Sequence, residues 1–357
     1  MGKHLILAAL LTVGLGLAAC QKNTYRKQMA ALDWGTDSCF VYGHKTPDAD
    51  AVCSALAYAQ LMRELGYNCV AKICGTTNRE TQYICGLFGF EAPAGQASVA
   101  RGTRIIATDH EEYSQSVDGA RESRILQIID HHQEGDMAAS GTLFIRRETV
   151  GSTCTIVWEL YREAKVRMDD SVTRILLAGI LSDTDNLAKT NTTQADTLAL
   201  RSLAAQLHIG PDSLTVIRAR MLEALSDYDG MSDYEIFVSD YKDYDMGDTA
   251  VGIGCVEWTD YATMDEFIDR MLAVSPEVMD RKGRSVVFLM ATRYEADPET
   301  DGKAVATGTY ILYSGDGARE AAERIYGKSL RAGVCYSENR LVRKRDVTPA
   351  LTGYYGQ

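Results

Sequence analysis

Residues 39–50 read CFVYGHKTPDAD, and this stretch decides the fold. It begins with a short apolar run, residues 39–42, that is typical of a buried strand. A polar segment with one histidine and two aspartates follows. Apolar residues at helical spacing then continue over residues 50–65 and end at Gly66. A strand, a polar turn and a helix in this order favour an α/β protein that binds its ligand where the strand ends.

The same alternation continues along the chain. Further strands are expected at residues 69–73, 104–108, 125–129 and 142–145. Further helices are expected at residues 152–164, 171–181 and 194–207. Strands that alternate with helices predict a mainly parallel sheet with helices on both faces.

A smaller second α/β domain is expected after this section. The stretch 227–248 is rich in Asp and Tyr, and we interpret it as a linker that leads into the second domain. Beyond it, strands are expected at residues 250–256, 285–291 and 304–312, and helices at 264–272 and 318–326. A length of 357 residues fits about two domains. We therefore predict a first domain at residues 37–226 and a second at residues 249–357.

The overall charge of the chain limits its partners. The formal net charge is −12 and the sequence pI is about 5.1, which argues against a general nucleic-acid binder, because such a protein needs a basic face. A small anionic substrate needs only local positive charge, so the acidic composition does not exclude it. The nine cysteines form no C-x-x-C pair, and neither a zinc framework nor a disulfide framework is indicated.

The amino terminus resembles an export signal. Lys3 is followed by an apolar run at residues 5–19, which is shorter than the roughly 20 residues that a spanning helix requires. The run ends in Leu17-Ala18-Ala19-Cys20, which resembles a bacterial lipoprotein cleavage box. We therefore expect a signal peptide at residues 1–20, a lipid on Cys20, a polar tether at 21–36, and anchoring on the extracytoplasmic side of a bacterial membrane. The alternative is an uncleaved apolar tail on a cytoplasmic enzyme.

Ionisable residues gather where predicted elements end. They lie in four segments, at residues 43–50, 108–110, 130–132 and 182–185. These segments hold four of the six histidines, and their carboxylate and imidazole groups together suit Mn, Co, Fe or Zn rather than Ca. So many ligands exceed what one ion requires, and we predict two ions about 3.5–4 Å apart. Taken singly, Asp48 or Asp50 could instead cap the following helix.

These segments resemble the motifs of the DHH phosphoesterase superfamily, which is named after the Asp-His-His run at residues 130–132. The similarity is closer to one branch, the family II or manganese-dependent inorganic pyrophosphatases, and extends from about residue 37 to residue 351. Four further motifs of that branch have similar stretches in this chain. Gly-His-Lys-Asn-Pro-Asp-Thr-Asp is similar to residues 43–50, and Asp-His-Asn-Glu to residues 109–112. Ser-Asp-Thr is similar to residues 182–184, and Arg-Lys-Lys to residues 343–345.

The resemblance implies a site with two or more Mn²⁺ ions, with Co²⁺ or Mg²⁺ as alternatives. It implies that one ion is held by His44, Asp48, Asp109 and Asp183. It implies that the other is held by Asp50, Asp109, His131 and Asp183. The implied substrate contacts are His132, Lys242, Arg343 and Lys344. The implied activity is hydrolysis of pyrophosphate, or of short polyphosphate, by a metal-bridging hydroxide. The resemblance places the active site in the cleft between the two domains, and a homodimer is a further expectation.

The sequence departs from the family pattern at a few positions, and other functions stay open. The departures are Thr46, Ala49, Ala51, Glu111 and Val342. They remove no implied ligand, but they leave substrate preference undecided. One alternative is an exopolyphosphatase or another DHH-type phosphoesterase, although the Gly-Gly-Gly-His motif of the nucleotide-cleaving branch does not occur. A second alternative is a non-catalytic, lipid-anchored binding protein that has kept the fold.

Overall fold

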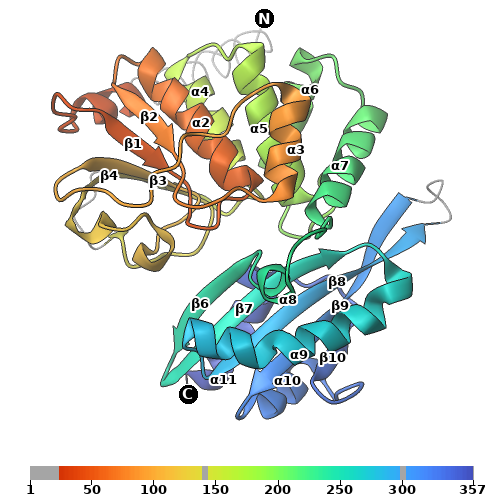
Figure 1. Cartoon of the computed structure of the whole chain (residues 1–357). Helices are drawn as coiled ribbons and strands as arrows, with labels where there is room; N and C mark the ends of the chain where they lie inside the picture. The colour runs from red at the N-terminus through yellow and green to blue at the C-terminus, as the bar shows by residue number, and fades with distance from the viewer. Residues whose placement is uncertain (1–23, 139–143, 298–302, 357) are drawn as a thin grey trace, which may run out of the picture. The chain divides into compact units, whose positions relative to one another are not determined.

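The computed structural model describes residues 24–138, 144–297 and 303–356, and these form two units. The first unit comprises the chain up to Thr77 and residues 81–215, and the second comprises residues 78–80 and the chain from Val216 onward. Each unit contains one five-stranded sheet with helices packed on it (Figure 1). The expected α/β architecture is therefore confirmed. Among the described residues, no helix is long and apolar enough to cross a membrane.

The sheet of the first unit is parallel throughout. Its strand order is β2-β1-β3-β4-β5. The strands are β1 (Cys39–Tyr42), β2 (Cys69–Lys72), β3 (Arg104–Thr108), β4 (Arg124–Asp130) and β5 (Phe144–Arg147). Because all five strands run the same way, their carboxyl ends meet at one edge of the sheet, where such sheets bind ligands.

The longer helices of the first unit are α2 (Ala49–Glu64), α3 (Arg79–Phe88), α4 (Thr153–Ala164), α5 (Asp170–Thr184), α6 (Gln194–Gln206) and α7 (Pro211–Leu225), and α7 continues into the second unit. Of these, α2 and α4 pack directly on one face of the sheet, α5 packs on α2 and α4, and α6 packs on α4 and α5. Helix α2 packs on β1 and β2 and also on α5, which explains why nearly all its residues are buried. The opposite face packs on the connections around β3 and β4, which include the short helices η1 (Tyr113–Gln115) and η2 (Ala120–Glu122).

The amino-terminal segment requires a correction. We expected a polar tether at residues 21–36, but residues 24–30 are helical, with Tyr25 and Met29 buried. The hydroxyl oxygens of Tyr25 and Tyr58 lie 3.1 Å apart, and the Tyr25 ring contacts Phe144. Apolar side chains one helical turn apart therefore attach this segment to the first unit. The expected signal peptide and the expected lipidation site, Cys20, lie outside the described residues.

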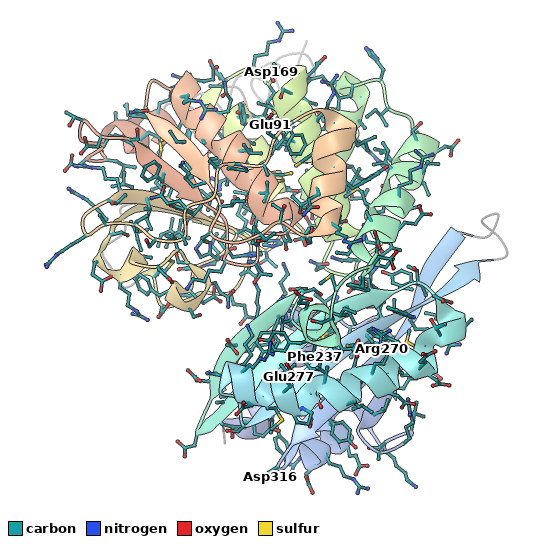
Figure 2. The ribbon with its side chains drawn as sticks, in the orientation of Figure 1. Glu91, Asp169, Phe237, Arg270, Glu277 and Asp316 are labelled. Carbon is teal, nitrogen blue, oxygen red and sulfur yellow. The ribbon has the colours of Figure 1, made fainter. Side chains whose placement is uncertain are left out.

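The second unit is built on a mixed sheet with strand order β10-β9-β8-β7-β6, in which only β7 and β8 pair in parallel. The strands are β6 (Tyr241–Met246), β7 (Thr249–Trp258), β8 (Val286–Asp297), β9 (Lys303–Gly315) and β10 (Val334–Ser337). One face packs on α8 (Asp233–Phe237) and α9 (Met264–Lys282), and Phe237 and Arg270 mark this side in Figure 2. The other face packs on α10 (Ala318–Tyr326) and α11 (Thr348–Tyr355).

Most expected elements are present, and several shorter or more polar ones were missed. The missed elements are α3, α7, α8, β6, β10 and α11. Strand β6 lies inside the stretch that we interpreted as a linker, and its sequence YKDYDM alternates polar and aromatic residues. It is an edge strand that buries few side chains, so its apolar signal is weak.

Candidate metal centre

Three adjacent strands deliver histidine and aspartate residues to one edge of the first sheet. Asp109 directly follows β3, His44 follows β1, and His131 and His132 follow β4. Asp109 has a φ angle of 62°, in the left-handed region that an aspartate rarely adopts. Backbone strain of this kind is concentrated at functional sites, and here it turns the Asp109 side chain toward the neighbouring strand ends.

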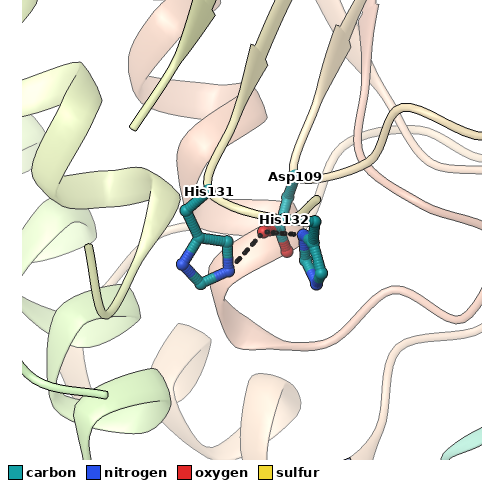
Figure 3. A group of neighbouring side chains, drawn as sticks. All are labelled: Asp109, His131 and His132. Carbon is teal, nitrogen blue, oxygen red and sulfur yellow. Dashed lines mark ion pairs between the residues drawn. The ribbon is translucent and has the colours of Figure 1, made fainter. Parts of the chain in front are cut away.

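The Asp109 carboxylate lies at the centre of the cluster (Figure 3). Its Oδ1 atom is 3.2 Å from Nε2 of His131 and 3.7 Å from Nδ1 of His132, and these two rings flank it. Its Oδ2 atom is 3.5 Å from Nε2 of His44, which in turn lies 3.4 Å from Oδ2 of Asp48. One carboxylate therefore has a separate set of neighbours on each oxygen, as a group shared between two ions requires.

All six predicted metal ligands lie in groups that could hold an ion. The ligand atoms of each group lie within 4.8 Å of one another, and the groups are His44/Asp48/Asp109, Asp50/His131/Asp183 and Asp109/His131/His132. Asp183 joins through its Oδ2 atom, 3.2 Å from Nε2 of His131. Asp183 therefore groups with Asp50 and His131. The resemblance implied that Asp183 also binds the ion that His44 holds. His110, from the same sequence segment as Asp109, is buried with its Nδ1 atom 2.9 Å from the Thr108 carbonyl oxygen.

Asp48 has both of the roles that the sequence left open. Its Oδ1 atom accepts a hydrogen bond of 2.9 Å from the backbone N–H of Ala51, so it caps the amino terminus of α2. Its Oδ2 atom is the one that faces His44. The cap holds the carboxylate in a fixed orientation, with Oδ2 directed at the ring of His44.

The two histidines of the Asp-His-His run have fixed ring orientations. Nδ1 of His131 lies 3.1 Å from the carbonyl oxygen of Val150, and a carbonyl can only accept, so Nδ1 carries the proton and Nε2 is left as the ligand atom. Nδ1 of His132 lies 2.8 Å from Oδ1 of Asp130. That same oxygen also accepts the backbone N–H groups of His131 and His132. Asp130 therefore orients the run rather than joining a metal group among the described residues.

The amino terminus of α4 supports two of the buried carboxylates, and our sequence reasoning missed it. Ser152 donates its hydroxyl to Oδ1 of Asp50 at 2.7 Å, and the backbone N–H of Thr153 donates to Oδ2 at 2.7 Å. The Thr153 hydroxyl donates to Oδ1 of Asp109 at 2.9 Å. The signal in the sequence is the run GSTCT at residues 151–155, in which small hydroxyl residues begin a predicted helix.

The charges in this cluster favour a bound cation. Burial, followed by repulsion from Asp109 and Asp183, raises the pKa of Asp50 to about 8. Burial, followed by repulsion from Asp48, raises the pKa of Asp109 well above its usual range. Divalent cations would remove this penalty, and the available donors are carboxylate oxygens and imidazole nitrogens without a thiolate. This set fits Mn²⁺.

Because the pKa of Asp50 is raised, the stability of the metal-free protein should depend on pH. A carboxyl group whose pKa is raised by folding contributes stability at low pH and loses that contribution as pH rises through the folded value. We therefore expect the free energy of unfolding to fall between about pH 4 and about pH 8, and Mn²⁺ to reduce the fall. Urea unfolding at several pH values measures this change in the free energy of unfolding, and Asp50→Asn is the control. An equally steep fall in the control would contradict this expectation.

Glu111, one of the departures from the family pattern, is paired with an arginine. Its side chain is fully buried, and Nε and Nη2 of Arg147 donate to its two oxygens at 2.7 and 2.5 Å. Arg147 lies on β5 directly opposite Asp130. The pair therefore fastens the segment after Asp109 to the edge strand beside the Asp-His-His run.

Loss of the arginine should be costly, because it leaves a buried carboxylate without its partner. We expect Arg147→Met to lower the free energy of unfolding by about 3 kcal/mol, and the double variant with Glu111→Met to recover part of it. Chemical denaturation measures both. Arg121→Met is the control, because Arg121 is exposed and its ion pair with Asp136 should be worth at most about 1 kcal/mol. Equal losses for the two single variants would contradict the assignment.

The predicted substrate residues of the second unit lie near one another. Lys242 on β6 pairs with Ile253 on β7. Arg343 donates through Nη1 to the carbonyl oxygens of Asp240 and Ile253, at 2.8 and 3.3 Å, and through Nη2 to Oδ1 of Asp240 at 2.6 Å. Lys344 follows in the turn η5 (Arg343–Val347). Arg343 is thus held by backbone and carboxylate groups, which fixes the place of its charge beside Lys242.

Comparison with known proteins places this architecture in a described class. Residues 38–180 match the DHH family, N-terminal domain, and residues 219–354 match the DHHA2 domain. A probable manganese-dependent inorganic pyrophosphatase of Clostridium acetobutylicum is 32% identical over 317 residues, which is 88% of this chain and 97% of that protein. The manganese-dependent inorganic pyrophosphatase of Methanothrix thermoacetophila is 30% identical over 317 residues, with the same coverage.

A solved structure agrees. The crystal structure of a Methanococcus jannaschii protein, provisionally described as a family II inorganic pyrophosphatase, matches with a TM-score of 0.77 and 28% sequence identity. The match covers 89% of this chain and 100% of that one. The chain belongs to the family of manganese-dependent inorganic pyrophosphatases.

Proposed function

We propose that this protein hydrolyses inorganic pyrophosphate to two phosphates at a centre of two Mn²⁺ ions in its first unit. The observation that carries the proposal is the Asp109 carboxylate, which has candidate ligands on both oxygens. The names of the relatives support the substrate and the metal. The set of acidic and imidazole donors supports a cation-dependent hydrolase over a binding protein.

The proposed ligand sets share Asp109 between two positions. His44 and Asp48 would hold one ion, and Asp50, His131 and Asp183 would hold the other, in the groups whose ligand atoms lie within 4.8 Å of one another. Bound Mn²⁺ would supply Lewis acidity toward a phosphoryl group and make a nucleophilic water available near neutral pH. The remaining roles are assigned to His132 of the first unit and to three basic residues of the second unit.

Those side chains neutralise and orient the substrate. His132 has its Nδ1 atom engaged with Asp130, so Nε2 is the nitrogen for contact with a phosphoryl oxygen. Lys242, Arg343 and Lys344 supply the positive charge that offsets the developing charge on the transferred group. An arginine can bind two oxygens of one phosphate, and a phosphate at Arg343 would compete with the Asp240 carboxylate that accepts from its Nη2 atom.

The test is phosphate release by the purified chain with Mn²⁺ on pyrophosphate, tripolyphosphate and a cyclic dinucleotide. We expect release from pyrophosphate to be fastest, and Asp183→Ala to abolish it. Faster release from the longer chain would move the protein to the exopolyphosphatases, and cleavage of the dinucleotide would move it to the phosphodiesterases. Inactivity on all three would overturn the proposal in favour of a binding protein.

We also propose that the protein is exported and anchored through a lipid on Cys20. The support is the sequence LAAC at residues 17–20 after an apolar run. In that location it would act on pyrophosphate outside the cytoplasm, as a homodimer or as a single chain. Mass spectrometry of the native amino terminus tests the anchor, and light scattering measures the assembly. A soluble protein that begins with Met1 would overturn the proposal.

A further inference from the structure

Asp196 is a fully buried carboxylate outside the metal groups. It lies in the first turn of α6, and its carboxylate accepts hydrogen bonds from Gly151, Thr155 and Thr193. Oδ2 accepts from the backbone N–H of Gly151 at 2.8 Å and from the backbone N–H and hydroxyl of Thr193 at 2.7 Å each. Oδ1 accepts the hydroxyl of Thr155 at 2.7 Å. One carboxylate therefore connects the start of α6 to the segment that begins α4.

That segment, residues 150–155, touches three of the proposed metal ligands. The carbonyl of Val150 orients the ring of His131. Ser152 and Thr153 donate to Asp50 and Asp109, as does the backbone N–H of Cys154 to Asp50 at 3.1 Å. A small displacement of this segment would therefore move the donors of three ligands together.

Gly151 is closely packed between Thr184 and Asp196. A Cβ atom at Gly151 would lie 2.7 Å from Cγ2 of Thr184 and 3.0 Å from Oδ2 of Asp196, so the segment passes close to the end of α5 without a side chain of its own. Thr184 directly follows Asp183 in α5. The carboxylate of Asp196 therefore holds the start of α4 to the start of α6, at a point where Gly151 passes close to the end of α5.

We propose that Asp196 is a positioning residue that raises the affinity of the centre for divalent cations through residues 150–155. This inference rests on the metal centre of the proposed function. The groups that orient metal ligands typically account for about 10–100-fold in metal affinity. Asp196 acts on three ligands together, so its effect belongs in metal binding and not only in the stability of the fold.

The experiment measures Mn²⁺ binding by electron paramagnetic resonance, in which the signal of free Mn²⁺ reports the unbound ion. We expect Asp196→Ala to weaken binding about 10–100-fold. Asp196→Asn should keep most of the affinity, because its amide oxygen can accept from Gly151 and Thr193 while its amide nitrogen donates to the Thr155 hydroxyl. If Asp196→Asn binds Mn²⁺ nearly as tightly as the wild type, the hydrogen bonds at this position hold the segment in place. A side chain that only fills space would not explain that result.

The control is Asp169→Ala. Asp169 caps α5 by accepting from the N–H of Val172 at 2.9 Å, and it is labelled in Figure 2 at the start of that helix. Its loss should lower stability by about 1 kcal/mol without changing Mn²⁺ affinity. If Asp196→Ala does not fold, Thr155→Val removes only one of the four hydrogen bonds and should still weaken Mn²⁺ binding several-fold.

The outcomes separate this inference from the proposed function. Unchanged Mn²⁺ affinity in a folded Asp196→Ala or Thr155→Val variant would overturn the role of Asp196, even if the wild type hydrolyses pyrophosphate. Weakened affinity with recovery in Asp196→Asn supports it, even if pyrophosphate is not the substrate. A wild type that binds no Mn²⁺ overturns both.

Discussion

Asp109→Asn is expected to reduce phosphate release from pyrophosphate by at least about 10³-fold, because bound metal ions supply several kcal/mol of transition-state stabilisation. Asparagine keeps the shape of the side chain, and its amide oxygen can still accept the hydroxyl of Thr153 at the position of Oδ1. The amide nitrogen then takes the place of Oδ2 beside His44 and cannot bind a cation. Mn²⁺ binding should weaken along with the rate, as equilibrium titration would show.

The matched control for this variant is Asp33→Asn. Asp33 is exposed and pairs with Arg104 and Arg124, at distances of 3.5 and 2.6 Å, where β3 and β4 begin. It therefore sits at the opposite ends of the strands that deliver Asp109 and His131. Its replacement should leave the rate within about twofold, because exposed ion pairs contribute at most about 1 kcal/mol to stability. A comparable loss of rate in both variants would show that Asp109 has no special role.

Removal of divalent metal should abolish the activity completely, and Mn²⁺ should restore it. The buried carboxylates of Asp50 and Asp109 repel each other, and bound divalent ions would offset that repulsion. Binding also stabilises the fold by mass action, by about 2.7 kcal/mol when free Mn²⁺ is about 100 times its Kd. Thermal unfolding with and without Mn²⁺ should therefore show a concentration-dependent rise in the midpoint.

Calcium is the informative comparison for the metal. Ca²⁺ prefers six to eight oxygen ligands, whereas this cluster includes the imidazoles of His44 and His131. We expect Ca²⁺ to restore little activity at concentrations where Mn²⁺ restores all of it. Activity that survives exhaustive chelation would contradict a metal-dependent mechanism.

The sequence predicted more of the site than of the surrounding structure. His44, Asp109 and His131 each follow a strand that the apolar pattern already indicated, and parallel strands bring such residues to one edge. The supporting residues were missed for a different reason. Ser152 and Asp50 are 102 positions apart, and Thr155 and Asp196 are 41 apart, so no local pattern links them.

By itself the sequence determined the class of fold and indicated which ionisable residues gather at the strand ends, because apolar periodicity and strand-end positions are properties of short stretches of chain. Only the tertiary structure decided that Asp48 both caps α2 and faces His44, that residues 24–30 pack on the first unit, and that Asp196 holds the start of α4. These features depend on how helices far apart in the chain pack together. That packing follows from the combined shape of many buried side chains rather than from any one segment.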